Sequence, residues 1–110
     1  MKSGLRIVDV LAKIDTGSTF CLFERHHGEA LHLDVAAGEE MWIRTLNGRF
    51  KVYGHEVSLA VFDVEHSAMV YFYEDYDFGR NVLGRRGWLD RVRLGLIDHD
   101  CELYLAAYND

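Results

Sequence analysis

Four residues near the N-terminus have the types and spacing needed for acid–base chemistry: Asp15, Thr16, Gly17 and Ser18, within KIDTGSTF at residues 13–20. Apolar segments flank them on both sides. An unpaired carboxylate is costly to bury, so Asp15 either lies in an ordinary turn or has a chemical role. Glycine at position 17 allows the backbone to turn sharply and to approach the carboxylate, where amide groups can hydrogen-bond its oxygens.

The chemistry open to such an aspartate is the activation of water, provided that a second carboxylate lies beside it. Two like charges this close do not both ionise, so the pair holds one proton over a wide pH range. The ionised member accepts a proton from water, and the protonated member donates one to the group under attack. The chain contains a single Asp-Thr-Gly sequence, so the second carboxylate has to come from a second copy. We therefore expect a homodimer with Asp15 of each subunit at a twofold axis.

A hairpin is predicted in the middle of the chain, over residues 41–53. Asn47-Gly48 lies between two strand-like runs, a pattern that favours a type I′ turn with positive φ at both residues. The apolar positions then change parity: Phe50 and Val52 share one face, whereas Val57 belongs to the opposite series. This change predicts a bulge or bend at Gly54.

The other elements are predicted from apolar runs and helical spacing. Residues 24–33 are compatible with a weak helix, and residues 86–92 predict one or two helical turns with Trp88, Leu89 and Val92 toward the core. The strands predicted outside the hairpin are residues 5–14, 19–23, 69–73, 81–83, 94–97 and 101–107.

Three segments, in this order, resemble the retropepsin-like aspartic proteases, the half-length relatives of pepsin. They are Ile14 to Ser18 (apolar-Asp-Thr-Gly-Ser), the flap-like TLNGRFKV at residues 45–52, and Asn81-Val82-Leu83-Gly84-Arg85 before a predicted helix. The resemblance covers residues 5–107. It implies one domain, residues 1–110, that is all-β with one short C-terminal helix and has the closed β-barrel of these acid proteases.

The resemblance also assigns expected roles to the loop around the aspartate. Asp15 would be the catalytic residue, and Thr16, Gly17 and Ser18 would form the active-site loop. The Thr16 hydroxyl would reach the opposite loop across the dimer, and the Ser18 hydroxyl would hydrogen-bond a carboxylate oxygen.

Two further segments would complete this site. The flap would close over an extended peptide and exclude water, and it would comprise Thr45, Leu46, Asn47, Gly48 and Arg49. Val82, Leu83 and Gly84 would pack beneath the aspartate loop, and Arg85 would form a structural salt bridge. The strand predicted at residues 101–107 would contribute to the dimer interface.

Composition excludes several other classes of function. The formal net charge of −6 argues against a nucleic-acid partner, and we expect the arginines near the C-terminus to be a solvated helix face. No run reaches the ~18 apolar residues of a membrane span. Asp9 and Lys13 interrupt any secretory signal, which predicts a cytoplasmic protein without a membrane partner.

Cysteines and histidines do not indicate a metal or another cofactor. Cys21 and Cys101 are expected to be two buried thiols. His27 and His32 are five residues apart, which is not the spacing of two metal ligands on one helix face, so we expect the histidines to be exposed.

The function predicted from these observations is an aspartic endopeptidase that acts on peptides or unfolded proteins. Two alternatives stay open. One is a catalytically inactive protease fold that serves as a peptide-binding or oligomerisation module. The other is an unrelated small β-barrel in which the loop at Asp15 is a plain turn.

Overall fold

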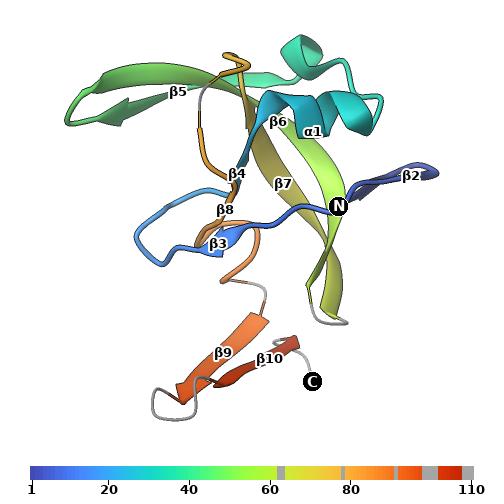
Figure 1. Cartoon of the computed structure of the whole chain (residues 1–110), viewed down its shortest axis with the longest axis vertical. Helices are drawn as coiled ribbons and strands as arrows, with labels where there is room; N and C mark the ends of the chain where they lie inside the picture. The colour runs from blue at the N-terminus through green and yellow to red at the C-terminus, as the bar shows by residue number, and fades with distance from the viewer. Residues whose placement is uncertain (62–63, 78, 91, 98–101, 108–110) are drawn as a thin grey trace.

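The computed structural model describes residues 1–61, 64–77, 79–90, 92–97 and 102–107, the last two ranges by their backbone alone (Figure 1). Most of these residues are in strands, as the sequence predicts. One α-helix, α1 (Arg25–Ala30), and one 3-10 helix, η1 (Val35–Ala37), complete the described structure. No helix in these ranges is long and apolar enough to cross a membrane.

Eight strands form one sheet, in the order β2-β1-β6-β7-β4-β8-β3, with β5 paired to β6 off this path. Its end strands, β2 and β3, are two residues long and are not paired with each other, so the sheet is open. The prediction of a closed β-barrel is therefore wrong. The strands of this sheet are β1 (Lys2–Ser3), β2 (Arg6–Ile7), β3 (Lys13–Ile14), β4 (Leu22–Phe23), β5 (Glu39–Thr45), β6 (Gly48–Val61), β7 (Val64–Tyr73) and β8 (Val82–Leu83).

The single strand predicted over residues 5–14 is split. Gly4 has a φ of +58° and turns the chain between β1 and β2, which leaves Leu5 fully exposed at the turn. After β2, Val8 still exchanges two backbone hydrogen bonds with Met1, each of 2.9 Å. Val8 and Val10 pack against the core, and strand pairing resumes at β3. The β-branched residues Val8 and Val10 are thus partly buried without belonging to a long strand, and Gly4 is the position at which the chain turns.

The hairpin of β5 and β6 is present, but its turn differs from the predicted type I′. Leu46 and Asn47 form the turn, and Gly48, with a φ of +131°, already pairs with Thr45. The Thr45 hydroxyl accepts a hydrogen bond from the Asn47 amide at 3.3 Å and donates one to the Gly48 carbonyl at 3.1 Å. These bonds favour a turn placed one residue earlier than the Asn-Gly pair suggests.

The parity change at Gly54 has a cause other than a bulge. The ladder between β6 and β7 keeps one register from Val52↔Tyr73 to Val61↔Val64, so no bulge is present. The strand does bend: β6 runs beside β5 across the upper part of the view and then turns downward beside β7 (Figure 1). Val52 and Val57 change parity because they face two different apolar clusters on opposite sides of β6.

The helical turns predicted at residues 86–92 do not form over the described residues 86–90: Arg86 forms an isolated β-bridge with Phe20, and residues 87–90 make successive turns. Gly87 has a φ of +100°, and its amide donates to the Asp90 carboxylate at 3.0 Å, which interrupts helical pairing. Trp88 is nonetheless completely buried, as its spacing predicts. Among the described residues the α-helix is α1, within the weak helix predicted at residues 24–33, so the expected C-terminal helix is wrong in position.

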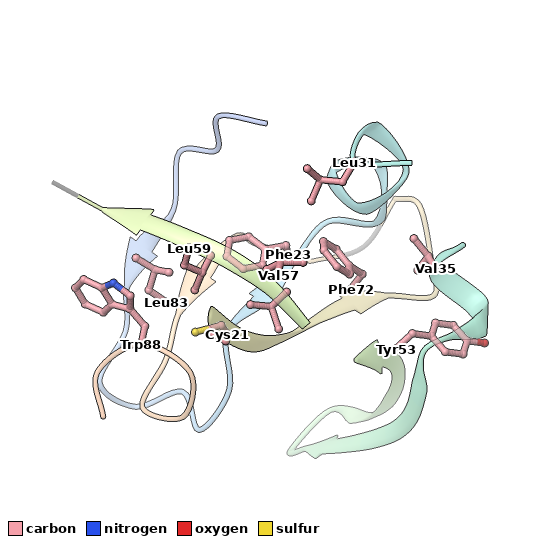
Figure 2. Packing of buried hydrophobic residues seen from close by; sticks show 12 residues of the cluster. Cys21, Phe23, Leu31, Val35, Tyr53, Val57, Leu59, Phe72, Leu83 and Trp88 are labelled. Carbon is pink, nitrogen blue, oxygen red and sulfur yellow. The ribbon is translucent and has the colours of Figure 1, made fainter. Parts of the chain in front are cut away.

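Two apolar clusters form the core. The larger one extends from Trp88 and Leu83 at one end to Val35 and Tyr53 at the other, with Phe72 between them (Figure 2). The smaller cluster comprises Leu22, Val52, Tyr73 and Val82. Adjacent residues of β4 and of β8 belong to different clusters, so these two short strands separate them.

The two C-terminal strands predicted from the sequence are present as β9 (Val92–Ile97) and β10 (Glu102–Ala107). They pair with each other in a separate antiparallel sheet. In Figure 1 this hairpin lies below the eight-stranded sheet, and β10 approaches β7. Cys101, which the sequence predicts to be a buried thiol, lies outside the described residues.

Candidate active site

Asp15 lies in a tight loop directly after β3. Its amide donates to the Leu83 carbonyl at 3.0 Å, which attaches the start of the loop to β8. The Gly17 amide donates to Asp15 Oδ1 at 2.9 Å, and the Ser18 amide donates to the Asp15 carbonyl at 3.1 Å. The Gly17 amide thus holds the half-buried carboxylate, and the other two bonds fix the backbone of Asp15.

The loop wraps around the end of β8. β8 is parallel to β3 on one side and pairs with β4 through Leu22↔Val82 on the other. Beyond β8, the Arg85 amide donates to the Ser18 carbonyl at 2.9 Å, and the Arg86 amide donates to the Thr19 carbonyl at 2.7 Å. Val82, Leu83 and Gly84 thus lie beneath the loop that carries Asp15.

Gly84 permits this close approach. A Cβ atom at this position would lie 2.2 Å from the Phe20 carbonyl oxygen and 2.8 Å from the Ser18 carbonyl oxygen. Both are backbone atoms of the aspartate loop. Only a residue without a side chain lets the two segments approach this closely.

An open cavity of about 390 Å³ lies beside Asp15. Three predicted segments contribute to it: the aspartate loop through Asp15 and Ser18, the hairpin through Thr45, and β8 through Val82. The other lining residues are Leu22, Phe50, Tyr73, Gly79 and Arg80. The cavity is therefore lined by apolar residues together with two residues of opposite charge, Asp15 and Arg80.

The tip of the hairpin is mostly outside this cavity. Thr45 lines it, whereas Leu46, Asn47, Gly48 and Arg49 do not. Leu46 is fully exposed, with a relative exposure of 105%. The Arg49 guanidinium lies over the Trp42 ring, 4.6 Å from its centroid.

Two expected side-chain interactions, those of Ser18 and Arg85, differ in the structure, and the expected contact of Thr16 with a second subunit stays a prediction. The Ser18 hydroxyl donates to the Phe20 carbonyl at 2.7 Å, and not to the Asp15 carboxylate, because the tight loop brings that carbonyl within reach. Arg85 donates to Thr19 Oγ1 at 3.1 Å and has no ion pair within the described residues. Thr16 is exposed, and its hydroxyl has no hydrogen-bond partner in the part of the chain that the structure describes.

Sequence reasoning did not identify Arg80, Tyr73 and Gly79 as part of the site. The Tyr73 hydroxyl donates to the Arg80 carbonyl at 3.1 Å, and burial raises the pKa of Tyr73, so the phenol keeps its proton. Gly79 has a φ of +106°, and a Cβ atom there would overlap the Tyr73 ring. The available signal was the position of Gly79 and Arg80 immediately before the Asn81 to Arg85 segment.

A second polar cluster lies at the start of α1. One ligand atom from each of Glu24, His26 and His27 can be chosen so that all three lie within 4.8 Å of one another. His26 and Glu24 are exposed to different extents, with side-chain exposures of 57% and 33%. Burial, with a further contribution from His26, lowers the pKa of His27. His26 is exposed, as expected for the histidines, whereas His27 is half-buried.

Comparison with family models, with curated proteins and with solved structures found no match to this chain. The interpretation of both polar sites therefore depends on their geometry.

Proposed function

We propose that the protein is an aspartic endopeptidase whose active unit is a homodimer. Asp15 of each subunit would provide one of two carboxylates that share a proton. The substrate would be an extended peptide or an unfolded protein segment. The fold proposed for this activity is that of the retropepsin-like proteases, in which the open sheet described above belongs to one half of the active unit.

The observation that carries the proposal is the convergence of three distant segments on one cavity. Asp15, Thr45 and Val82 come from the aspartate loop, the hairpin and β8, and all three line the same space. The Asp15 carboxylate is half-buried, and it accepts a backbone hydrogen bond from Gly17. A plain surface turn does not require this combination of a held carboxylate, a cavity lined largely by apolar residues and a hairpin that contributes to the same cavity.

The proposed mechanism uses each part of the site once. The ionised Asp15 would take a proton from water, and the protonated Asp15 of the other subunit would donate to the carbonyl of the peptide bond. The apolar cavity would hold a substrate side chain next to the reacting water. The hairpin would exclude bulk water when substrate is bound, and its exposed tip leaves room for this movement.

The proposed dimer interface uses the two ends of the chain. Leu5 and Ile7 lie at or near the β1–β2 turn with relative exposures of 101% and 65%, and Leu11 follows with 96%. Large apolar side chains that are this exposed gain free energy when a partner covers them. The β9–β10 hairpin, which is separate from the main sheet, would supply the other part of the interface.

The test is cleavage of a mixed peptide library at acidic and neutral pH, with and without a pepstatin-type transition-state mimic. Asp15→Asn should lower the cleavage rate by at least a factor of about 100, since in a homodimer the substitution removes both carboxylates of the acid–base pair. Asp34→Asn is the matched control, because Asp34 is exposed and does not line the cavity. Circular dichroism and sedimentation should show the same fold and assembly for both variants.

Two outcomes would contradict the proposal. Cleavage that survives in Asp15→Asn would remove the carboxylate from the mechanism. A protein that sediments as a monomer at every concentration would leave no second carboxylate. A dimer that binds peptides without cleaving them would instead favour the inactive peptide-binding module.

A further inference from the structure

The cluster at the start of α1 is arranged around a common point. His26 Nε2 and Glu24 Oε2 are 3.4 Å apart. The rings of His26 and His27 lie 4.0 Å apart between centroids, tilted by 44°. Two imidazole nitrogens and one carboxylate oxygen thus lie within 4.8 Å of one another, and they come from residues that are close neighbours in sequence.

A residue from another element orients the carboxylate of this cluster. Asn81, just before β8, donates from Nδ2 to Glu24 Oε1 at 2.9 Å. Its Oδ1 accepts a hydrogen bond from the Glu24 amide, also at 2.9 Å. This pair of bonds occupies one carboxylate oxygen and leaves Oε2 directed toward His26. Outer-shell partners of this kind are typical of metal sites, where they fix the ligating atom.

We propose that Glu24, His26 and His27 bind a divalent transition-metal ion of borderline softness, such as Zn²⁺. Two imidazole nitrogens and one carboxylate oxygen are a ligand set that zinc accepts, with a fourth position left for water. Mg²⁺ and Ca²⁺ favour oxygen ligands and are not expected here. This site is separate from the proposed protease centre, and its ligands do not line the cavity at Asp15.

The distances agree with this ligand set. Zinc–ligand bonds of about 2.1 Å in a tetrahedron place neighbouring ligand atoms about 3.4 Å apart. The separation of His26 Nε2 and Glu24 Oε2 already has this value, 3.4 Å. The most distant pair among the three ligand atoms is at most 4.8 Å apart, so a rotation of partly exposed side chains is enough to close the site.

Nearby charge is compatible with a bound cation. Arg25, which lies between the ligands in sequence, points elsewhere: its Nη1 donates to the Glu74 carbonyl at 2.9 Å, and its guanidinium lies over the Tyr76 ring. Its Nε is 3.9 Å from Glu29 Oε2. The guanidinium is thus held by another loop and by another carboxylate, away from the three ligands.

Metal binding would connect two elements that now meet through Asn81. The Asn81 carbonyl accepts a hydrogen bond from the Lys13 amide at 2.9 Å, two residues before Asp15, and Arg80 precedes it at the cavity. An ion that fixes Glu24 would therefore restrain the pairing of α1 with β8 and β3. The expected sign of this effect is an increase in thermal stability with metal.

The experiment is titration of the tag-free full-length protein with Zn²⁺ by calorimetry and with Co²⁺ by absorption spectroscopy. We expect one equivalent to bind, with a cobalt spectrum of nitrogen and oxygen ligation that lacks a thiolate charge-transfer band. His26→Gln and His27→Gln should each weaken binding by about 100-fold or more, and Asn81→Ala by about tenfold. His32→Asn is the matched control, because it removes an imidazole outside the cluster while asparagine tolerates the φ of 60° at that position.

The inference is overturned if millimolar Zn²⁺ does not bind, since the cluster would then be a plain carboxylate–imidazole pair. It is also overturned if His26→Gln and His27→Gln, shown to be folded by circular dichroism, bind Zn²⁺ as tightly as the wild-type chain. A thiolate band in the cobalt spectrum would likewise assign the ion to a cysteine.

Discussion

The close approach between Gly84 and the aspartate loop can be tested by adding a single methyl group. In Gly84→Ala the new Cβ atom would lie 2.2 Å from the Phe20 carbonyl oxygen and 2.6 Å from the carbonyl carbon. Ordinary contact begins at 3.4 Å, so the loop has to move by about 1.2 Å, the difference between the two distances. The atoms in the way are backbone atoms, so no side-chain rotation relieves the overlap.

The expected loss of stability follows from two contributions. Overpacking of this kind costs about 1–3 kcal/mol. Moving the loop also lengthens the hydrogen bonds from the Arg85 and Arg86 amides to Ser18 and Thr19, each worth about 1 kcal/mol. Alanine also lowers the conformational entropy of the unfolded chain, which raises the free energy of unfolding by at most about 1 kcal/mol. We therefore expect Gly84→Ala to lower the free energy of unfolding by about 3 kcal/mol.

Urea unfolding followed by tryptophan fluorescence is a suitable assay. Trp88 is completely buried close to this segment, and its emission should shift to longer wavelength on unfolding. Trp42 is already 48% exposed and contributes little to the change. All variants should be compared at one protein concentration, because the stability of an assembled dimer depends on it.

Gly17→Ala provides the matched control in the same loop. Its Cβ atom would meet only Asp15 Oδ1, at 3.2 Å, and the backbone there does not require positive φ. We expect its free energy of unfolding to lie within about 1 kcal/mol of the wild-type value. If Gly84→Ala and Gly17→Ala have the same stability, the packing of β8 beneath the aspartate loop is not as described.

Two other predictions use different parts of the chain. Burial raises the pKa of the Cys21 thiol to about 11, so little reactive thiolate is present in the folded protein at pH 8. In a Cys101→Ser variant, iodoacetamide should therefore react with Cys21 at least about a hundredfold faster after unfolding in urea. Comparable rates for the folded and unfolded protein would contradict the burial. Leu46→Ser at the hairpin tip should change the free energy of unfolding by less than about 0.5 kcal/mol, since the side chain is fully exposed. The same variant should lower kcat/KM for peptides severalfold if the hairpin covers substrate, and an unchanged value would separate the tip from the site.

The sequence predicts the elements of this chain that depend on local signals. The hairpin around Asn47-Gly48 and the strands β7, β8, β9 and β10 all form near the predicted residues. Turn residues and runs of β-branched side chains act within a few positions, so a single sequence reveals them. The contact of Asp15 with Leu83 could be predicted only from the resemblance to the retropepsin-like proteases, because both residues belong to motifs of that family.

The errors arise where tertiary contacts decide the backbone conformation. At Gly54 the change of parity indicated a bulge, but the strand is regular and has apolar clusters on both faces. At residues 86–90 the spacing of Trp88 and Leu89 fits a helix, yet the Asp90 carboxylate binds the Gly87 amide and favours turns. Apolar spacing reports which side chains are buried, and it does not distinguish the backbone conformations that bury them.

The stability of the core and the geometry of the candidate site are coupled through β8. Leu83 belongs to the larger apolar cluster, and its carbonyl accepts a hydrogen bond from the Asp15 amide. Val82, its neighbour, belongs to the smaller cluster and lines the cavity. Two adjacent residues thus connect both clusters to the carboxylate, so a substitution that weakens either cluster near β8 should also displace Asp15. The loop that carries the proposed chemistry is short and partly exposed, and it takes its rigidity from this buried strand.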